Sequence, residues 1–161
     1  MTEDEILTFA RGLDGVTVET ADAASGAPEA AWGDSFIYYD RPGAAPEPAD
    51  RRWPFATLVV HDYAGFDESS QLDRDGVFRV NVNAGKRRFE ELLGYPPSRH
   101  DEHCAEHDYA AFDTVLPHPE YGQQAWVSVV NPSEHTSALV RTLLSEARGR
   151  AATRRGQAGR T

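Results

Sequence analysis

Cysteine is almost missing from this chain, because Cys104 is the only one among 161 residues. No intrachain disulfide can form, and no cysteine-based zinc cluster is possible. Long apolar runs are missing as well, since none approaches the roughly 18 residues that a membrane-spanning helix needs. The N-terminal segment MTEDEILTF is acidic where a secretory signal would be basic and then apolar, so we expect a cytoplasmic protein without membrane contacts.

Three reaction-specific motifs are also missing. The chain has neither GxGxxG nor GxxxxGK[ST], so nucleotide binding by those two loops is excluded. It has no GxSxG elbow, which leaves Ser128 and Ser133 without support as nucleophiles of a serine triad. Hydrophobic residues make up 40% and charged residues 26%, which is ordinary for one globular domain of this length.

The formal net charge of −10 is spread unevenly along the chain. Residues 148–161 hold five arginines and no acids, which leaves −15 for residues 1–147. A body this acidic repels a phosphate backbone, so nucleic acid is not expected as a partner. The tail is rich in Ala, Gly, Arg and Thr, which predicts a frayed C-terminal end beyond a single domain at residues 1–147.

The pattern of apolar residues predicts an α+β fold. A helix is predicted to begin at Thr2, where Glu5 completes a capping box, a second at residues 85–93, and a third after Ser133 or Thr136. Strands are predicted at residues 16–20, 35–39, 55–62, 77–83 and 125–130. Loops rather than helices join most of these strands, which favours a single compact domain with an antiparallel sheet and flanking helices.

Five ordered segments carry a family resemblance: AWGDSFIYYD, PFATLVVHDY, LDRDGVFRVNVNAGKRRFEELLG, DTVLPHPEYGQQAWVSVVNPSEHT and LVRTLLSEAR. They resemble a family of small uncharacterised bacterial proteins, the domain of unknown function 6194. The resemblance runs from about Glu3 to Arg150. It implies no established activity.

The order of elements also resembles, more distantly, the MmcQ/YjbR-like proteins. Those proteins begin with a short helix, place a Trp-Gly-x-x-Phe-like strand early, and end with a Trp-Val strand followed by a helix. The resemblance implies a YjbR-like double-wing arrangement around an antiparallel sheet. That superfamily is sometimes labelled DNA-binding, but the acidic body departs from what the label needs, so we do not carry it over.

A histidine-rich segment, HDEHCAEHD, follows Pro96 and Pro97. At helical spacing His100, His103 and His107 are i, i+3 and i+7, which would align three imidazoles on one face and suit a metal such as zinc. The alternative is a polar surface loop, and the spacing matches no closed zinc motif. We favour the loop, and we predict no metal site and no cofactor.

His118 lies between two prolines, so its backbone has little freedom. A preorganised imidazole suits general acid–base chemistry, and Asp113 or Glu120 could orient it. The alternative is that His118 and Tyr121 staple the turn through hydrogen bonds between side chain and backbone. We favour this structural role, and His118 could have it and the acid–base role at the same time.

Polar residues alternate along the strand predicted at residues 77–83. Arg79, Asn81 and Asn83 share one face of it. If that face were covered, the three groups would suit an anionic or amide ligand. Exposed polar alternation on a sheet is the favoured explanation.

We therefore predict a binding module for a small molecule or a protein partner. Its pocket is predicted to be bounded by Trp32, Arg79, Asn81, His118, Tyr121 and Trp126. One alternative is a small enzyme that uses His118 as general acid or base, with or without a metal at the histidine cluster. A second is nucleic-acid binding through the arginine tail.

Overall fold

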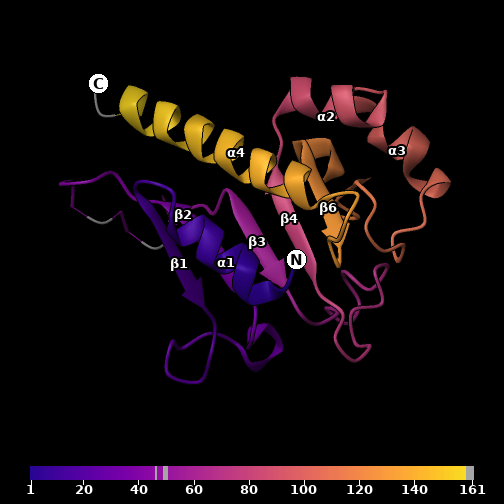
Figure 1. The fold of residues 1–161 in the computed structure, drawn as a ribbon, viewed down its shortest axis with the longest axis horizontal. Helices are drawn as coiled ribbons and strands as arrows, with labels where there is room; N and C mark the ends of the chain where they lie inside the picture. The colour runs from indigo at the N-terminus through magenta and orange to yellow at the C-terminus, as the bar shows by residue number, and fades with distance from the viewer. Residues whose placement is uncertain (46, 49–50, 159–161) are drawn as a thin grey trace.

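A computed structural model describes residues 1–45, 47–48 and 51–158. Within them one antiparallel sheet has the strand order β1-β2-β3-β4-β6-β5. Its strands are β1 (Val16–Thr20), β2 (Ser35–Tyr39), β3 (Ala56–Val59), β4 (Arg79–Asn83), β5 (Leu116–Pro117) and β6 (Trp126–Val130). The helices are α1 (Glu3–Arg11), α2 (Lys86–Leu93), α3 (His100–His103) and α4 (Ser137–Ala158). These elements form one compact unit, and the predicted α+β class is confirmed (Figure 1).

The predicted strands are all present, although β3 ends at Val59 rather than at Asp62 and β4 begins at Arg79 rather than at Val77. The short strand β5 was not predicted. It pairs with β6 through Leu116 opposite Ser128 and Pro117 opposite Val127. Two residues are too few to show a period in the sequence.

The first helix begins as the sequence predicts. The Thr2 backbone N–H donates to the Glu5 carboxylate at 2.8 Å, and the Glu5 N–H donates to the Thr2 hydroxyl at 3.2 Å. This capping box satisfies two N–H groups that the first turn of a helix otherwise leaves without acceptors. Ile6 and Ala10 then face the sheet and are fully buried.

One face of the sheet carries the apolar core. Helices α1 and α4 lie across it, and α2 adds Phe89 at one side (Figure 1). The buried side chains of the strands on this face are Ile37, Ala56, Leu58, Val80, Val82, Val127 and Val129. The helices meet them mainly with Ile6, Ala10, Val140, Leu143, Leu144 and Ala147. Removing this apolar surface from water is the main source of the fold's stability.

The opposite face of the sheet is covered by the loop at 60–76 and the turn at 118–121, since Asp67, Ser70 and His118 all contact Arg79 there. Strand register places Thr57 beside Asn81, and Asn81 beside Ser128. Asn81 and Ser128 are buried, as is Arg79 on the same face of β4. Polar groups therefore lie under the loops, which corrects the sequence-based preference for an exposed polar face at Arg79 and Asn81.

Helix α4 continues to Ala158, which corrects the prediction of a frayed tail for residues 148–158. The Arg148 guanidinium contacts the Asp14 carboxylate at 2.8 Å, and Arg155 contacts Glu47 at 2.5 Å. These contacts hold the last turns against distant parts of the chain, and Ala and Arg are themselves good helix formers. Arg160, also assigned to the tail, lies outside the described residues. None of the described helices is both long and apolar enough to span a bilayer.

The segment after Pro96, predicted as a loop, forms three short helical turns instead. They are η3 (Pro97–Arg99), α3 and η4 (Cys104–Glu106). Pro97 stands at the first position of η3, where its missing N–H costs nothing. This segment packs beside η5 (Gly122–Gln124), which precedes β6.

Candidate functional site

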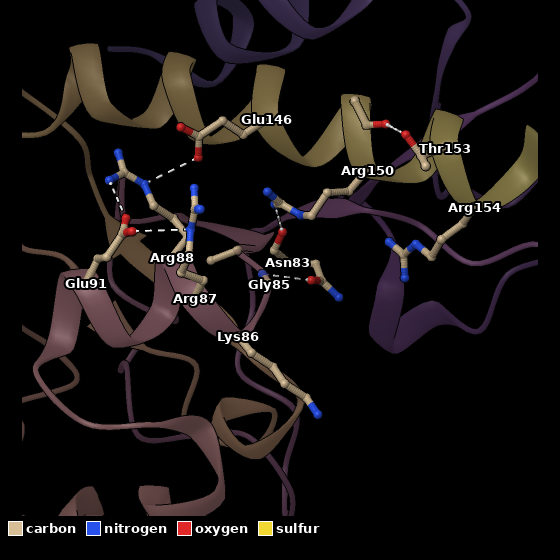
Figure 2. A pocket seen from close by; sticks show the side chains of 12 residues that line it. Asn83, Gly85, Lys86, Arg87, Arg88, Glu91, Glu146, Arg150, Thr153 and Arg154 are labelled. Carbon is tan, nitrogen blue, oxygen red and sulfur yellow. Dashed lines mark hydrogen bonds and ion pairs between the residues drawn. The ribbon is translucent and has the colours of Figure 1, made fainter.

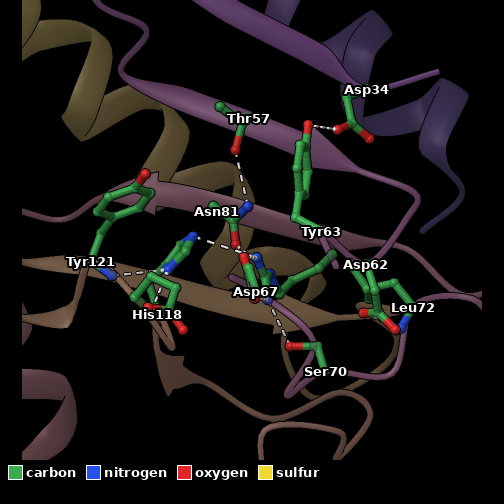
Figure 3. A network of polar contacts seen from close by, with 12 residues as sticks. Asp34, Thr57, Asp62, Tyr63, Asp67, Ser70, Leu72, Asn81, His118 and Tyr121 are labelled. Carbon is green, nitrogen blue, oxygen red and sulfur yellow. Dashed lines mark hydrogen bonds and ion pairs between the residues drawn. The ribbon is translucent and has the colours of Figure 1, made fainter. Parts of the chain in front are cut away.

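A buried network of polar contacts on the polar face of the sheet includes Asp67, Ser70, Asn81 and His118 (Figure 3). At its centre Arg79 is 1% exposed, and its guanidinium contacts both oxygens of Asp67, Nη1 at 3.0 Å and Nη2 at 2.5 Å. Nη1 also donates to the Ser70 hydroxyl at 2.7 Å, and Nε donates to Asn81 Oδ1 at 2.8 Å. The guanidinium charge is therefore fully compensated inside the protein.

The loop that carries Asp67 and Ser70 is fixed at several points. Tyr63 donates its hydroxyl hydrogen to Asp34, and the Val60 N–H donates to the same carboxylate at 2.8 Å. Burial raises the pKa of Tyr63, and its bond to Asp34 raises it further, so the phenol stays protonated. Further along the loop, the Leu72 N–H donates to Asp62 at 2.8 Å. The partners of Arg79 are thus held on a fixed piece of backbone.

Asn81 connects this network to the surface. Its Oδ1 accepts from Arg79, and its Nδ2 donates to the Thr57 hydroxyl oxygen at 2.9 Å. In that bond the Thr57 hydroxyl oxygen is the acceptor. The hydroxyl hydrogen of Thr57 therefore remains available to donate to another group.

His118 staples its own turn. Its Nδ1 accepts hydrogen bonds from the backbone N–H of Glu120 at 3.0 Å and of Tyr121 at 3.1 Å. Nδ1 therefore carries no proton, and the neutral ring has its hydrogen on Nε2. The predicted structural role of His118 in the turn is confirmed.

The electrostatics of His118 argue against acid–base work near neutral pH. Burial, and then the charge of Arg79, lower the pKa of His118 to about 3. Nε2 lies 3.4 Å from Arg79 Nη2, where two N–H groups face one another without bonding. A base this weak, with its lone pair occupied by two backbone N–H groups, is poorly suited to take a proton from a substrate.

A cavity of about 550 Å³ opens beside His118. Its walls are mainly aromatic, from Phe36, Tyr38, Trp53, Tyr121 and Trp126. Trp53 is 80% exposed and Tyr121 43% exposed, although both are large apolar groups. The polar groups of its lining are Arg52, Thr57, His118 and Gln124. We call this space the aromatic cavity.

Arg52 brings no free charge to the aromatic cavity. Its Nη2 contacts Asp40 at 2.6 Å, its Nε donates to the same carboxylate at 3.2 Å, and Nη1 contacts Glu19. The guanidinium lies 3.9 Å from the centre of the Tyr38 ring. Arg52 is thus a rigid part of the wall, paired with acids and stacked on an aromatic face.

A match to DUF6194, described as a family of unknown function, covers residues 1–160. The chain belongs to this family. Comparison with curated proteins and with solved structures finds no match. The more distant MmcQ/YjbR-like relation and its double-wing arrangement therefore stay predictions.

In this DUF6194 member the six residues predicted to bound a pocket separate into three groups. His118, Tyr121 and Trp126 line the aromatic cavity. Asn81 does not line the cavity but donates a hydrogen bond to Thr57, which does. Arg79 in turn donates a hydrogen bond to Asn81. Trp32 is not in the lining, and its indole N–H donates to the Ala27 carbonyl at 3.0 Å.

Sequence reasoning missed seven lining residues: Phe36, Tyr38, Arg52, Trp53, Pro54, Thr57 and Gln124. The alternation of SFIYY does place Phe36 and Tyr38 on one face of β2. Only the pairing of Phe36 with Thr57 across β2 and β3 shows that this is the polar face. The exposed Trp53 follows a proline-rich stretch and gave no local signal of a cavity.

Asp113, one of the two acids considered as partners of His118, has another role. Asp113 accepts from the backbone N–H groups of Ser133, His135 and Thr136, at 2.7–3.0 Å, and so caps the start of α4. Burial opposes its ionisation, but these bonds and one from the Thr136 hydroxyl outweigh burial and hold the pKa of Asp113 well below its usual range. Asp113 is therefore a structural residue.

The histidine cluster surrounds Tyr95 instead of a common point. The ring of His103 stacks on Tyr95 at 4.1 Å between centres, and the Tyr95 hydroxyl lies 2.9 Å from His107 Nε2 and 3.4 Å from His100 Nδ1. Burial lowers the pKa of His100 and of His107, which keeps both rings neutral. Nowhere in the described part of the chain do three or more His, Cys, Asp or Glu side chains form a group that could hold a metal.

Proposed function

We propose that this DUF6194 protein is a binding module that holds a planar, uncharged aromatic or heteroaromatic small molecule in the aromatic cavity. The volume of about 550 Å³ lies within the range of small-molecule sites. Five aromatic side chains supply flat walls, and such rings stack favourably on another planar ring. These walls are the observation that carries the proposal.

Charge compensation supports an uncharged ligand. Arg52 is paired with Asp40 and Glu19, Arg79 is paired with Asp67, and His118 is neutral at pH 7. A charged ligand would lose its hydration in the cavity without gaining an unpaired partner there. The Thr57 hydroxyl hydrogen is a donor available to the cavity, whereas the Nε2–H of His118 faces Arg79, and this favours a ring with an acceptor atom on one edge.

The other roles considered for this chain receive less support. The lowered pKa of His118 weighs against the acid–base enzyme. Arg148 and Arg155, two of the arginines considered for nucleic-acid binding, are paired with Asp14 and Glu47. We also propose a cytoplasmic location, since the single cysteine is a free, exposed thiol.

Three probes test the proposed ligand class: indole, indole-3-acetate and tryptamine. They share one ring and differ in charge at pH 7, being neutral, anionic and cationic. Isothermal calorimetry should show indole binding at least as tightly as either charged analogue, because none of the described residues presents an unpaired charge to the cavity.

Matched tryptophan variants locate the binding. Trp53→Ala should weaken indole binding about tenfold, since it removes one wall. Trp32→Ala is the control and should leave the affinity unchanged. Equal losses in the two variants, or no binding by any of the three probes, would overturn the proposal.

A further inference from the structure

A second cavity, of about 870 Å³, lies between α2 and the C-terminal half of α4 (Figure 2). Five cationic side chains and only two acids line it, a net of +3 in a chain whose net charge is −10. The cations are Lys86, Arg87, Arg88, Arg150 and Arg154, and the acids are Glu91 and Glu146. We call this space the cationic cavity.

Its acids are already engaged with two of the cations. Glu91 contacts Arg87 at 3.4 Å and Arg88 at 3.2 Å, and Glu146 contacts Arg88 at 3.3 Å. Among the described residues, no carboxylate lies within ion-pair distance of the other three cations, Lys86, Arg150 and Arg154. By contrast, Arg52, the cationic residue in the lining of the aromatic cavity, is paired with Asp40 and Glu19.

Arg150 is held in place despite its like-charged neighbours. Its Nη2 donates to the Asn83 carbonyl, and its guanidinium lies over Gly85, where a Cβ would come within 3.2 Å of Nε. The Nε atom is shielded from solvent and has no acceptor among the described residues. Burial lowers the pKa of Arg150, and the charges of Arg154 and Arg88 add to this effect while Glu146 opposes it.

The N-terminus of α2 adds positive potential to the same wall. Gly85 precedes the helix without a side-chain cap, and no acid stands in the first turn. That turn instead begins with Lys86, Arg87 and Arg88, although carboxylates are the favoured side chains at this end of a helix. An anion in the cavity would reduce the repulsion between the helix N-terminus and the side chains of Lys86, Arg87 and Arg88. It would also reduce the repulsion of Arg150 by Arg154 and Arg88.

We propose that the cationic cavity binds a multiply charged oxyanion, the phosphate group of a small phosphorylated molecule. Guanidinium groups match the geometry of phosphate oxygens and can bond two of them at once. The cations are gathered in one concavity, and the rest of the chain is acidic, so a phosphate that fits inside is favoured over an extended nucleic-acid backbone. The site is separate from the aromatic cavity and does not depend on its proposed ligand.

The chain offers a local reporter, because Lys86 is its only lysine. Acetylation by a dilute amine-reactive reagent, followed by peptide mass spectrometry, measures the reactivity of Lys86. The amine of Met1, which donates to the Pro132 carbonyl, is the internal control. Added pyrophosphate should slow acetylation of Lys86 at constant ionic strength and leave Met1 unchanged. Inorganic phosphate should act in the same way at higher concentration.

Variants of α4 test which cations hold the anion. Arg150→Gln and Arg154→Gln should each weaken pyrophosphate binding about tenfold, since each removes a charged hydrogen-bond donor. Arg148→Gln is the matched control, because Arg148 lies on the same helix, pairs with Asp14 and does not line the cavity. Circular dichroism verifies that all three variants fold.

Three results would overturn the proposal. Equal protection of Lys86 and Met1 would show that pyrophosphate acts on the whole surface. Equal affinity in the Arg150, Arg154 and Arg148 variants would show that the cavity is not the site. Tighter binding of a single-stranded oligonucleotide than of pyrophosphate, with Lys86 protected, would assign the cations to nucleic acid.

Discussion

The two faces of the sheet are built in opposite ways. The helix-covered face buries aliphatic side chains such as Leu58 and Leu144, whereas the loop-covered face buries the ion pair of Arg79 and Asp67. Aliphatic burial stabilises a fold directly, while a buried ion pair gains little over an apolar pair of similar size because both charges lose their hydration. The comparison indicates that the helix face holds the fold together and that the polar face positions the aromatic cavity.

Breaking the ion pair should have the largest effect. Asp67→Ala leaves Arg79 charged and buried without a counter-charge, and we expect a loss of about 3–5 kcal/mol in the free energy of unfolding. Denaturant titration measures it. The paired variant Asp67→Leu with Arg79→Met should regain at least half of the loss. A double variant as unstable as the single one would show that the ion pair itself stabilises the fold.

Truncating the helix face should cost slightly less. Leu144 is fully buried among the helices and the sheet, so Leu144→Ala should lower the free energy of unfolding by about 2–5 kcal/mol. Indole binding by the folded fraction should be unchanged, because the aromatic cavity lies on the other face. Weaker indole binding in this variant would contradict the separation of the two faces.

Replacing the turn staple should have a smaller effect. His118→Ala leaves the N–H groups of Glu120 and Tyr121 without their acceptor, and we expect a loss of about 1–3 kcal/mol by denaturant titration. His118→Asn is the matched variant, since its side-chain oxygen can accept the same bonds. If Asn restores no stability, the staple is not the reason for the loss.

The pH dependence should be the smallest effect near neutrality. Folding lowers the pKa of His118 from about 6.5 to about 3. Between these two pH values the imidazole is protonated in the unfolded chain and neutral in the folded chain, which favours unfolding. The stabilisation is complete above about pH 6.5 and is lost gradually between there and about pH 3. As the pH falls below about 6.5, the native protein should therefore lose stability more steeply than His118→Asn, which has no imidazole to titrate at this position. Parallel curves would contradict the burial of a neutral imidazole.

Local patterns made much of this fold predictable. The capping box at Thr2 and the alternation in β4 need only neighbouring residues, so both were predicted. The C-terminal half of α4 was not, because Arg148 and Arg150 contact Asp14 and Asn83, which are far away in the sequence.

The candidate site divides in the same way. His118 and Tyr121 belong to one short turn, and the sequence could bring them together. Phe36 and Thr57 meet only through the register of β2 with β3, which no local pattern reveals. Arg79 was expected on an exposed face because its counter-charge, Asp67, comes from a loop without a distinctive pattern.

The most direct test of the aromatic cavity uses the three tryptophans of the chain. Trp53 and Trp126 line the cavity and Trp32 does not, so their indole N–H signals in a ¹H–¹⁵N spectrum are two reporters and one control. Titration with indole should shift the signals of Trp53 and Trp126 together and leave Trp32 in place. A spectrum in which Trp32 moves as much as the other two, or in which none moves, would contradict a ligand site on the polar face of the sheet.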